Sequence, residues 1–237
     1  MNKPIPYAFS LFVGKYEKFL LIAFLVQVPI LLLHSFTTNY VHAVTPTIGS
    51  IFSVADIYYA YITMLLLIYA MVPFIKYTVN EYEGRENPLK NAFYTFAAQG
   101  FHIFLFSAVI SLLTVLGFIL FIIPGFVILA AFISAPIIAI MDGKSVWKST
   151  KESFQIFKKH SWKIILFIFL ISILEFIIGI VLNFLLLSIT DSYAAVVITQ
   201  IFLNTIFFPV FVVILTSLVI KWREGLNSLE VKNEAVI

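Results

Sequence analysis

Six long apolar stretches restrict what this chain can fold into more than any other feature of its sequence. They are residues 19–36, 54–79, 102–116, 118–141, 162–189 and 195–220. Most are long enough to cross the hydrocarbon core of a bilayer, about 30 Å, as an α-helix. Their continuous apolarity does not fit the alternating pattern of a transmembrane β-barrel strand. Only 11% of the 237 residues are charged, too few to form the surface of a soluble domain, so the sequence predicts an all-α integral membrane protein.

The positive charges are distributed asymmetrically between the connections. All fifteen Lys and Arg residues fall in four places. These are the segment before the first stretch, the connection between the second and third stretches, the connection between the fourth and fifth, and the segment after the sixth; a few lie at the stretch ends that border these connections. The other connections carry only His42, Asp56 and Asp191. Because positively charged connections stay in the cytoplasm, this distribution predicts six transmembrane helices with both termini cytoplasmic. The third and fourth stretches adjoin, and we expect a tight hairpin turn within residues 117–125.

The first stretch has an alternative interpretation. Residues 1–43 are compatible with a long signal peptide, which has a basic start, an apolar middle and a cleavage site, here Val41-His42-Ala43. The apolar part is long for such a peptide, and an internal repeat requires this stretch as a permanent membrane helix.

That repeat is threefold, because residues 8–12, 92–96 and 153–157 align with one another. Two further sets of residues coincide in the same register: Lys18, His102 and Lys163 open apolar stretches, and Gln27, Ser111 and Ser172 lie inside them. We therefore predict one six-helix domain over residues 1–225, with units at about 1–80, 86–141 and 143–222, and a short cytoplasmic tail over 226–237. Each unit is expected to contain an amphipathic helix followed by a helical hairpin.

The amphipathic helix is clearest in the third unit. Trp147, Thr150, Phe154 and Phe157 share one helical face, and lysines lie largely on the other. Such a helix lies in the membrane interface, with lysines toward anionic headgroups. The candidate lipid-interface residues are Lys148, Lys151, Lys158, Lys159, Trp147 and Trp162. Alternatively, these helices only orient the hairpins.

The second unit has a clear helix start. Asn87 precedes Pro88, which places a capping residue before a proline in the first turn.

Glu175 is the one acidic residue deep inside an apolar stretch, where a carboxyl costs about 3 kcal/mol. Polar residues on the same and neighbouring stretches make up a candidate polar seam with it: Gln27, Ser172, Glu175, Asn183, Gln200 and Asn204. One hypothesis is a proton- or ion-coupled site in which Glu175 titrates. The other is that a protonated Glu175 forms hydrogen bonds between helices and serves packing.

The sequence offers little for catalysis. His34, His42, His102 and His160 lack metal-ligand spacing, and the chain has no cysteine. No serine lies in a nucleophile-elbow motif. We therefore expect no enzymatic activity, no cofactor and no metal site.

One region resembles a known family. The segment 117–125 (GFILFIIPG), followed by Pro136, Asp142-Gly143-Lys144 and Trp162-Lys163, is similar to the membrane domain of the glycerophosphoryl diester phosphodiesterase family and to YciC-type six-span bacterial proteins. The similarity covers roughly residues 110–170. It implies a bacterial plasma-membrane protein but no phosphodiesterase activity, because catalysis in that family belongs to a soluble barrel domain.

These observations predict a non-enzymatic protein that assists export, envelope homeostasis or resistance to membrane-active peptides. Its expected partners are the anionic headgroups of the bilayer and, as the resemblance implies, a transport or peptide-immunity system, with no role for nucleic acid. The alternative is a small ion- or proton-coupled transporter or channel that uses Glu175.

Overall fold

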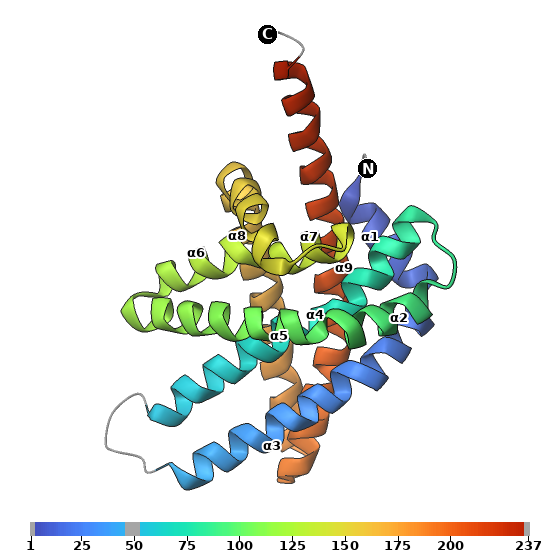
Figure 1. Cartoon of the computed structure of the whole chain (residues 1–237). Coiled ribbons are helices and arrows are strands. Elements are labelled where there is room, and N and C mark those ends of the chain that lie inside the picture. The colour runs from blue at the N-terminus through green and yellow to red at the C-terminus, as the bar shows by residue number, and fades with distance from the viewer. Residues whose placement is uncertain (1–2, 46–52, 235–237) are drawn as a thin grey trace.

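The computed structural model describes residues 3–45 and 53–234, with side chains described as far as Leu226 (Figure 1). Its helices are α1 (Pro4–Gly14), α2 (Tyr16–Ile22), the π-helix η1 (Ala23–Gln27), α3 (Val28–Val44), α4 (Val54–Glu83), α5 (Pro88–Leu120), α6 (Ile122–Phe132), α7 (Ala135–Asp142), α8 (Val146–Leu187) and α9 (Tyr193–Glu234). No strand occurs within these ranges, and six helical segments are long and apolar enough to span a membrane. The predicted all-α membrane architecture is confirmed.

The six segments form three helical hairpins. The first consists of α2, η1 and α3 paired with α4, the second of α5 paired with α6 and α7, and the third of α8 paired with α9. Figure 1 shows both chain termini at one end of the molecule, which we call the terminal end. The turn between α8 and α9 lies at the opposite end, which we call the hairpin end. The α3–α4 hairpin runs obliquely toward that end, and the α5–α6 hairpin points to one side.

Local sequence signals define several helix boundaries. α4 begins with a capping box, in which the main-chain N–H of Ser53 donates to the Asp56 carboxylate and the Asp56 N–H donates to the Ser53 hydroxyl. It ends at Gly84, whose φ of 64° suits glycine. α5 begins at Pro88 as expected, but the predicted capping hydrogen bond is absent: Asn87 adopts a left-handed conformation, φ 51°, and its side chain caps nothing.

The turn predicted within residues 117–125 lies at Phe121, which is extended between α5 and α6. The two helices approach very closely beside it. A Cβ atom added to Gly117 would lie 2.9 Å from the main chain of Gly125. Glycine at both positions therefore allows the backbones of the second hairpin to touch.

The apolar core lies toward the terminal end and is built around the second helix of each hairpin. Ile75 of α4, Ile137 of α7 and Leu215 of α9 are completely buried. Each of these helices also carries a buried proline: Pro73, Pro136 and Pro209.

Toward the hairpin end the three hairpins diverge (Figure 1). The later part of α8 shows this best, because Leu170, Phe176 and Phe184 expose 56%, 67% and 77% of their surface. Such apolar exposure fits contact with lipid chains rather than with water. The divergence leaves room between the first and third hairpins, where the first cavity described below lies, and between the two helices of the third hairpin, where the second lies.

The first and third units bend at equivalent positions. Lys15 separates α1 from α2 with φ −130° and ψ 23°, and His160 interrupts α8 with φ −130° and ψ 18°. Lys15 and His160 match in the register that aligns Lys18 with Lys163. The second unit has no such bend, since α5 is continuous, so its amphipathic part is not a separate helix.

Burial follows the same register in all three units. Ala8, Ala92 and Ser153 coincide, and each exposes no more than 1% of its surface. These shared features are what a threefold repeat predicts.

The segment predicted as a short cytoplasmic tail, residues 226–237, continues α9 as a helix as far as Glu234. Residues 235–237 of that tail, and residues 1, 2 and 46–52 of the first unit, lie outside the described part. So does the side chain of Lys232, one of the charges used to predict topology.

Candidate functional site

A short π-helical segment places Gln27 inside the bundle. Pro29 has no N–H to donate to the carbonyl of Leu25, so the regular α-helical pattern cannot continue across it. The N–H of Val28 instead bonds to the carbonyl of Ala23, five residues back. Such π-helical turns occur frequently at functional sites. Here the turn leaves Gln27 with 2% of its surface exposed.

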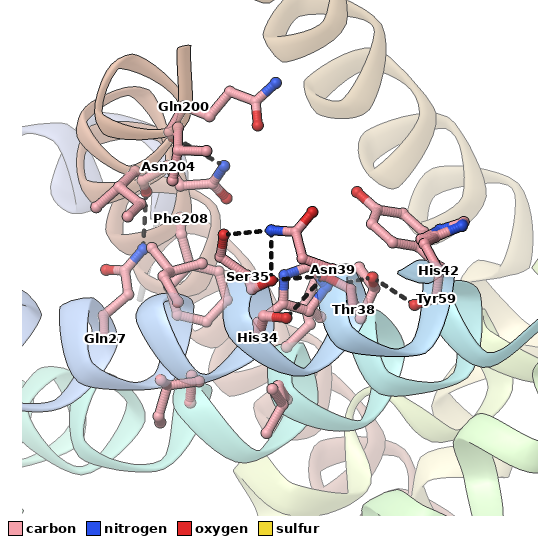
Figure 2. A pocket seen from close by; sticks show the side chains of 18 of the residues that line it. Gln27, His34, Ser35, Thr38, Asn39, His42, Tyr59, Gln200, Asn204 and Phe208 are labelled. Carbon is pink, nitrogen blue, oxygen red and sulfur yellow. Dashed lines mark hydrogen bonds between the residues drawn. The ribbon is translucent and has the colours of Figure 1, made fainter. Parts of the chain in front are cut away.

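Gln27 lies at one end of a cavity of about 380 Å³ between α3, α4 and α9 (Figure 2). Three hydrogen bonds cross this space between helices. Gln27 Nε2 donates to the main-chain carbonyl of Asn204 over 2.8 Å, and Tyr193 Oη donates to Asn39 Oδ1 over 2.7 Å. His34 Nε2 and Thr63 Oγ1 form the third, over 2.8 Å. Because the hydroxyl of Thr63 donates to a main-chain carbonyl in its own helix, His34 is the donor in this pair.

A second cavity, of about 510 Å³, lies between α8 and α9. Ser172, Glu175 and Asn183 of α8 line it. Gln200 and Asn204 of α9 line both cavities, as does Tyr59 of α4. The two cavities are thus adjacent, and each of the six polar-seam residues predicted from the sequence lines at least one of them.

The seam has unused hydrogen-bonding capacity. The side-chain oxygens Gln27 Oε1 and Asn183 Oδ1 are buried and have no partner among the described residues. Glu175 is half-buried in α8, roughly midway between Lys163 and Ser188. No hydrogen bond or ion pair links its carboxyl group to any residue that the structure describes. An unpartnered carboxyl at that depth is costly, so a partner from outside the chain would stabilise it.

Ser111, which aligns with Gln27 and Ser172 in the sequence, lies elsewhere. It is completely buried in α5, its hydroxyl has no partner among the described residues, and it lines neither cavity.

The predicted lipid-interface residues lie on the first part of α8 and around its bend. The four lysines are exposed, and Lys158 Nζ lies 4.9 Å from the centre of the Phe154 ring. Trp162 exposes 72% of its surface, and Trp147 is half-exposed while its ring packs edge-on against Phe106. A different face of this part of α8 packs against the rest of the bundle. It is formed by Val146, Ser149, Ser153 and Ile156. Of the predicted aromatic face, Trp147 and Phe154 are partly exposed, whereas Phe157 packs against the core.

An ion-pair network at the terminal end was not predicted from the sequence. Arg223 of α9 donates two hydrogen bonds to Asp142 at the end of α7, over 2.5 and 2.6 Å, and two further ones to Glu152 of α8. Lys144 joins the same carboxylates over 2.7 and 3.0 Å. We call these four residues the clasp. Burial acts against the charged form of Lys144, but hydrogen bonds to Asp142 and Glu152 outweigh it and raise the pKa of Lys144.

The sequence analysis also missed the residues of the first cavity other than Gln27, Gln200 and Asn204. His34 and His42 were considered from the sequence as metal ligands, for which their spacing is unsuitable, and not as cavity residues. A signal was present, because Ser35, Asn39 and His42 recur at helical spacing and form a polar stripe on one face of α3. As for metals, the described residues contain no group of three or more His, Asp or Glu side chains that could hold an ion.

Comparison with known proteins adds no name to this arrangement. No protein-family model matches the chain, and neither a curated protein nor a solved structure matches it.

Proposed function

We propose that this chain is a non-enzymatic, multi-pass protein of the bacterial plasma membrane that binds and moves a small solute or ion through the polar seam. The observation that carries this proposal is the convergence of the six seam residues on two adjacent cavities, with Glu175 near the middle of the apolar part of α8. Membrane-buried carboxyl groups of this kind mark ion and substrate pathways. The absence of a bond from Glu175 to any described residue favours this role over packing.

In the proposed topology both termini lie in the cytoplasm. The cavities then lie between the middle of the membrane and its outer surface, because α3 and the end of α8 run toward the hairpin end. The positive-inside distribution of lysine and arginine supports this orientation.

The chain's lack of cysteine gives a direct test of topology. An Asp191→Cys variant should react with a membrane-impermeant maleimide in intact cells. A Lys151→Cys variant should react only after the cells are permeabilised. The reverse pattern would refute the proposed orientation.

A second candidate function is assistance to export or resistance to membrane-active peptides. The exposed lysines of α8 beside outward aromatic rings favour it, since this surface can hold anionic headgroups. The resemblance of residues 110–170 to YciC-type proteins points to the same setting.

One experiment separates the two candidates. Cells deleted for the gene are complemented with the wild type, with Glu175→Gln, or with Lys148, Lys151, Lys158 and Lys159 all changed to Gln. Sensitivity to inorganic ions, organic amines and membrane-active peptides is scored, and membrane levels of each variant are measured by immunoblot.

If the seam carries the function, Glu175→Gln fails to complement at normal protein levels. Ser188→Ala, a control at the exposed C-cap of the same helix and outside both cavities, complements. If Glu175→Gln complements and the lysine variant does not, the second candidate replaces the first.

A further inference from the structure

We infer that the two cavities form one binding site for an organic cation that carries ammonium N–H groups. The ammonium group would face Glu175 in the second cavity, and a hydrogen-bonding or aromatic body would occupy the first. This inference rests on the proposed function of the seam and adds the chemical class of its ligand.

The charged residues that line the cavities indicate that the ligand is positively charged. Glu175 is the one acidic side chain among the residues that line either cavity, and neither lining contains a lysine or an arginine. The two histidines of the first cavity, His34 and His42, lie outside the cavity that Glu175 lines. A carboxylate at this depth therefore needs a positive charge that the lining does not supply.

The size of the site argues for an organic ion rather than a bare metal ion. Cavities of about 380 and 510 Å³ fall within the roughly 300–1,000 Å³ typical of small-molecule sites. A metal ion of ordinary coordination needs several oxygen or nitrogen ligands held close together. Around Glu175 the described residues offer a single carboxyl group, with amides and hydroxyls spread along two helices.

Two aromatic residues beside Glu175 fit the same class of ligand. Tyr59 and Phe176 line the second cavity with it. The faces of aromatic rings attract ammonium groups, and more strongly where water is excluded. Tyr59 also lines the first cavity, so one ligand can pass its ring and reach both spaces.

The unpartnered polar atoms indicate that the ligand is a donor. Gln27 Oε1 and Asn183 Oδ1 are acceptors on residues that line the first and the second cavity, and both atoms are shielded, so each side chain would turn toward the cavity to meet a ligand. Leaving such atoms unpaired is unfavourable, and a ligand with N–H groups removes that cost. A quaternary ammonium ion, which has no N–H, would satisfy Glu175 but neither of these oxygens.

The test uses the purified full-length chain in lipid nanodiscs and three probes: 4-phenylbutylammonium, its trimethylammonium analogue and the neutral 4-phenylbutanol. Isothermal titration calorimetry should show the primary amine binding about tenfold or more tightly than the alcohol. The trimethylammonium analogue should lie between them. Glu175→Gln should weaken amine binding by about tenfold or more and leave alcohol binding unchanged. Ser188→Ala, at the exposed C-cap of α8 and outside both cavities, should change neither.

Size-exclusion chromatography shows whether the Glu175→Gln variant folds. If it does not fold, a second variant still tests the inference. Gln27→Leu removes a buried acceptor without touching Glu175, and it should weaken binding of the primary amine about fivefold and that of the trimethylammonium analogue less. Equal binding of amine and alcohol, or no binding of the amine, would overturn the inference.

The binding and complementation experiments together distinguish failure of the proposed ligand class from failure of the proposed function. If the amine does not bind but Glu175→Gln still fails to complement, the seam functions with a different ligand. If the amine binds in a Glu175-dependent manner but Glu175→Gln complements, the site exists and the proposed function is wrong.

Discussion

The side-chain amide of Gln27, in the first hairpin, donates a 2.8 Å hydrogen bond to the main-chain carbonyl of Asn204, in the third. This bond joins two hairpins that otherwise diverge toward the hairpin end. It also depends on the π-helical turn before Pro29, which positions Gln27. The seam is therefore a consequence of a local irregularity in the backbone as well as of polar residues in apolar helices.

The Gln27→Leu variant should have almost unchanged stability. It loses the bond to Asn204, worth about 0.6 kcal/mol if typical of membrane helices. It also removes the unpartnered Gln27 Oε1 from the interior, which is favourable. The free energy of unfolding, measured by titration with sodium dodecyl sulfate, should change by less than about 1 kcal/mol. A loss above about 2 kcal/mol would show that Gln27 is chiefly structural. The matched control is Gln200→Leu, because Gln200 is exposed on the facing helix.

The Arg223→Ala variant should be clearly destabilised. Arg223 bridges Asp142 and Glu152, and without it two half-buried carboxylates share one lysine. Breaking a fully buried pair costs about 3–5 kcal/mol, and partial exposure reduces this to about 1–3 kcal/mol here. Thermal unfolding in detergent should show the loss.

Two comparisons test whether the loss comes from the clasp. Arg223→Lys, which keeps the charge but not the forked geometry, should recover only part of the stability. Arg223→Ala combined with Asp142→Ala should cost less than the sum of the two single changes, because they remove the same interaction. Additive losses would show that the clasp contributes nothing as a unit.

The contribution of Lys144 to stability should depend on pH only in the alkaline range. Folding raises its pKa above the ordinary value of 10.5, so its contribution is fully present below that pH and is lost as the pH rises through the folded-state pKa. The melting temperature of Lys144→Met should therefore lie below that of the wild type by the same margin at pH 7 and pH 9. At pH 11 the margin should shrink. A margin that already falls between pH 7 and pH 9 would mean that another group controls the clasp.

The sequence predicted what depends on composition and periodicity. Six membrane-spanning helices, the turn near Phe121 and the separation of basic residues from the core all follow from apolar length and from charge. It also identified six polar residues that the fold brings to adjacent cavities, since polar side chains in apolar helices stand out.

What it missed depends on tertiary geometry. The bend at Lys15 follows Gly14, the last residue of α1, but the equivalent bend at His160 has neither glycine nor proline beside it to mark it. The partners of Arg223 lie 71 and 81 residues earlier in the chain, and only the packing of α7, α8 and α9 brings them together. The polar stripe of α3 is present in the sequence at helical spacing but was not identified there, and only the packing of α3 on α4 and α9 shows that it lines a cavity.

The Gly117→Ala variant tests the close contact within the second hairpin. Its Cβ atom would lie 2.9 Å from the Cα and N atoms of Gly125, and main-chain atoms cannot move aside as a flexible side chain can. We expect a loss of about 1–3 kcal/mol, as in other overpacked interiors, measured as a lower thermal unfolding temperature. Gly179→Ala is the matched control, since nothing lies within 4 Å of a Cβ atom added there and alanine favours the helix. If the two variants have equal stability, the α5 and α6 backbones do not touch at Gly117, and the second hairpin is held by its larger side chains.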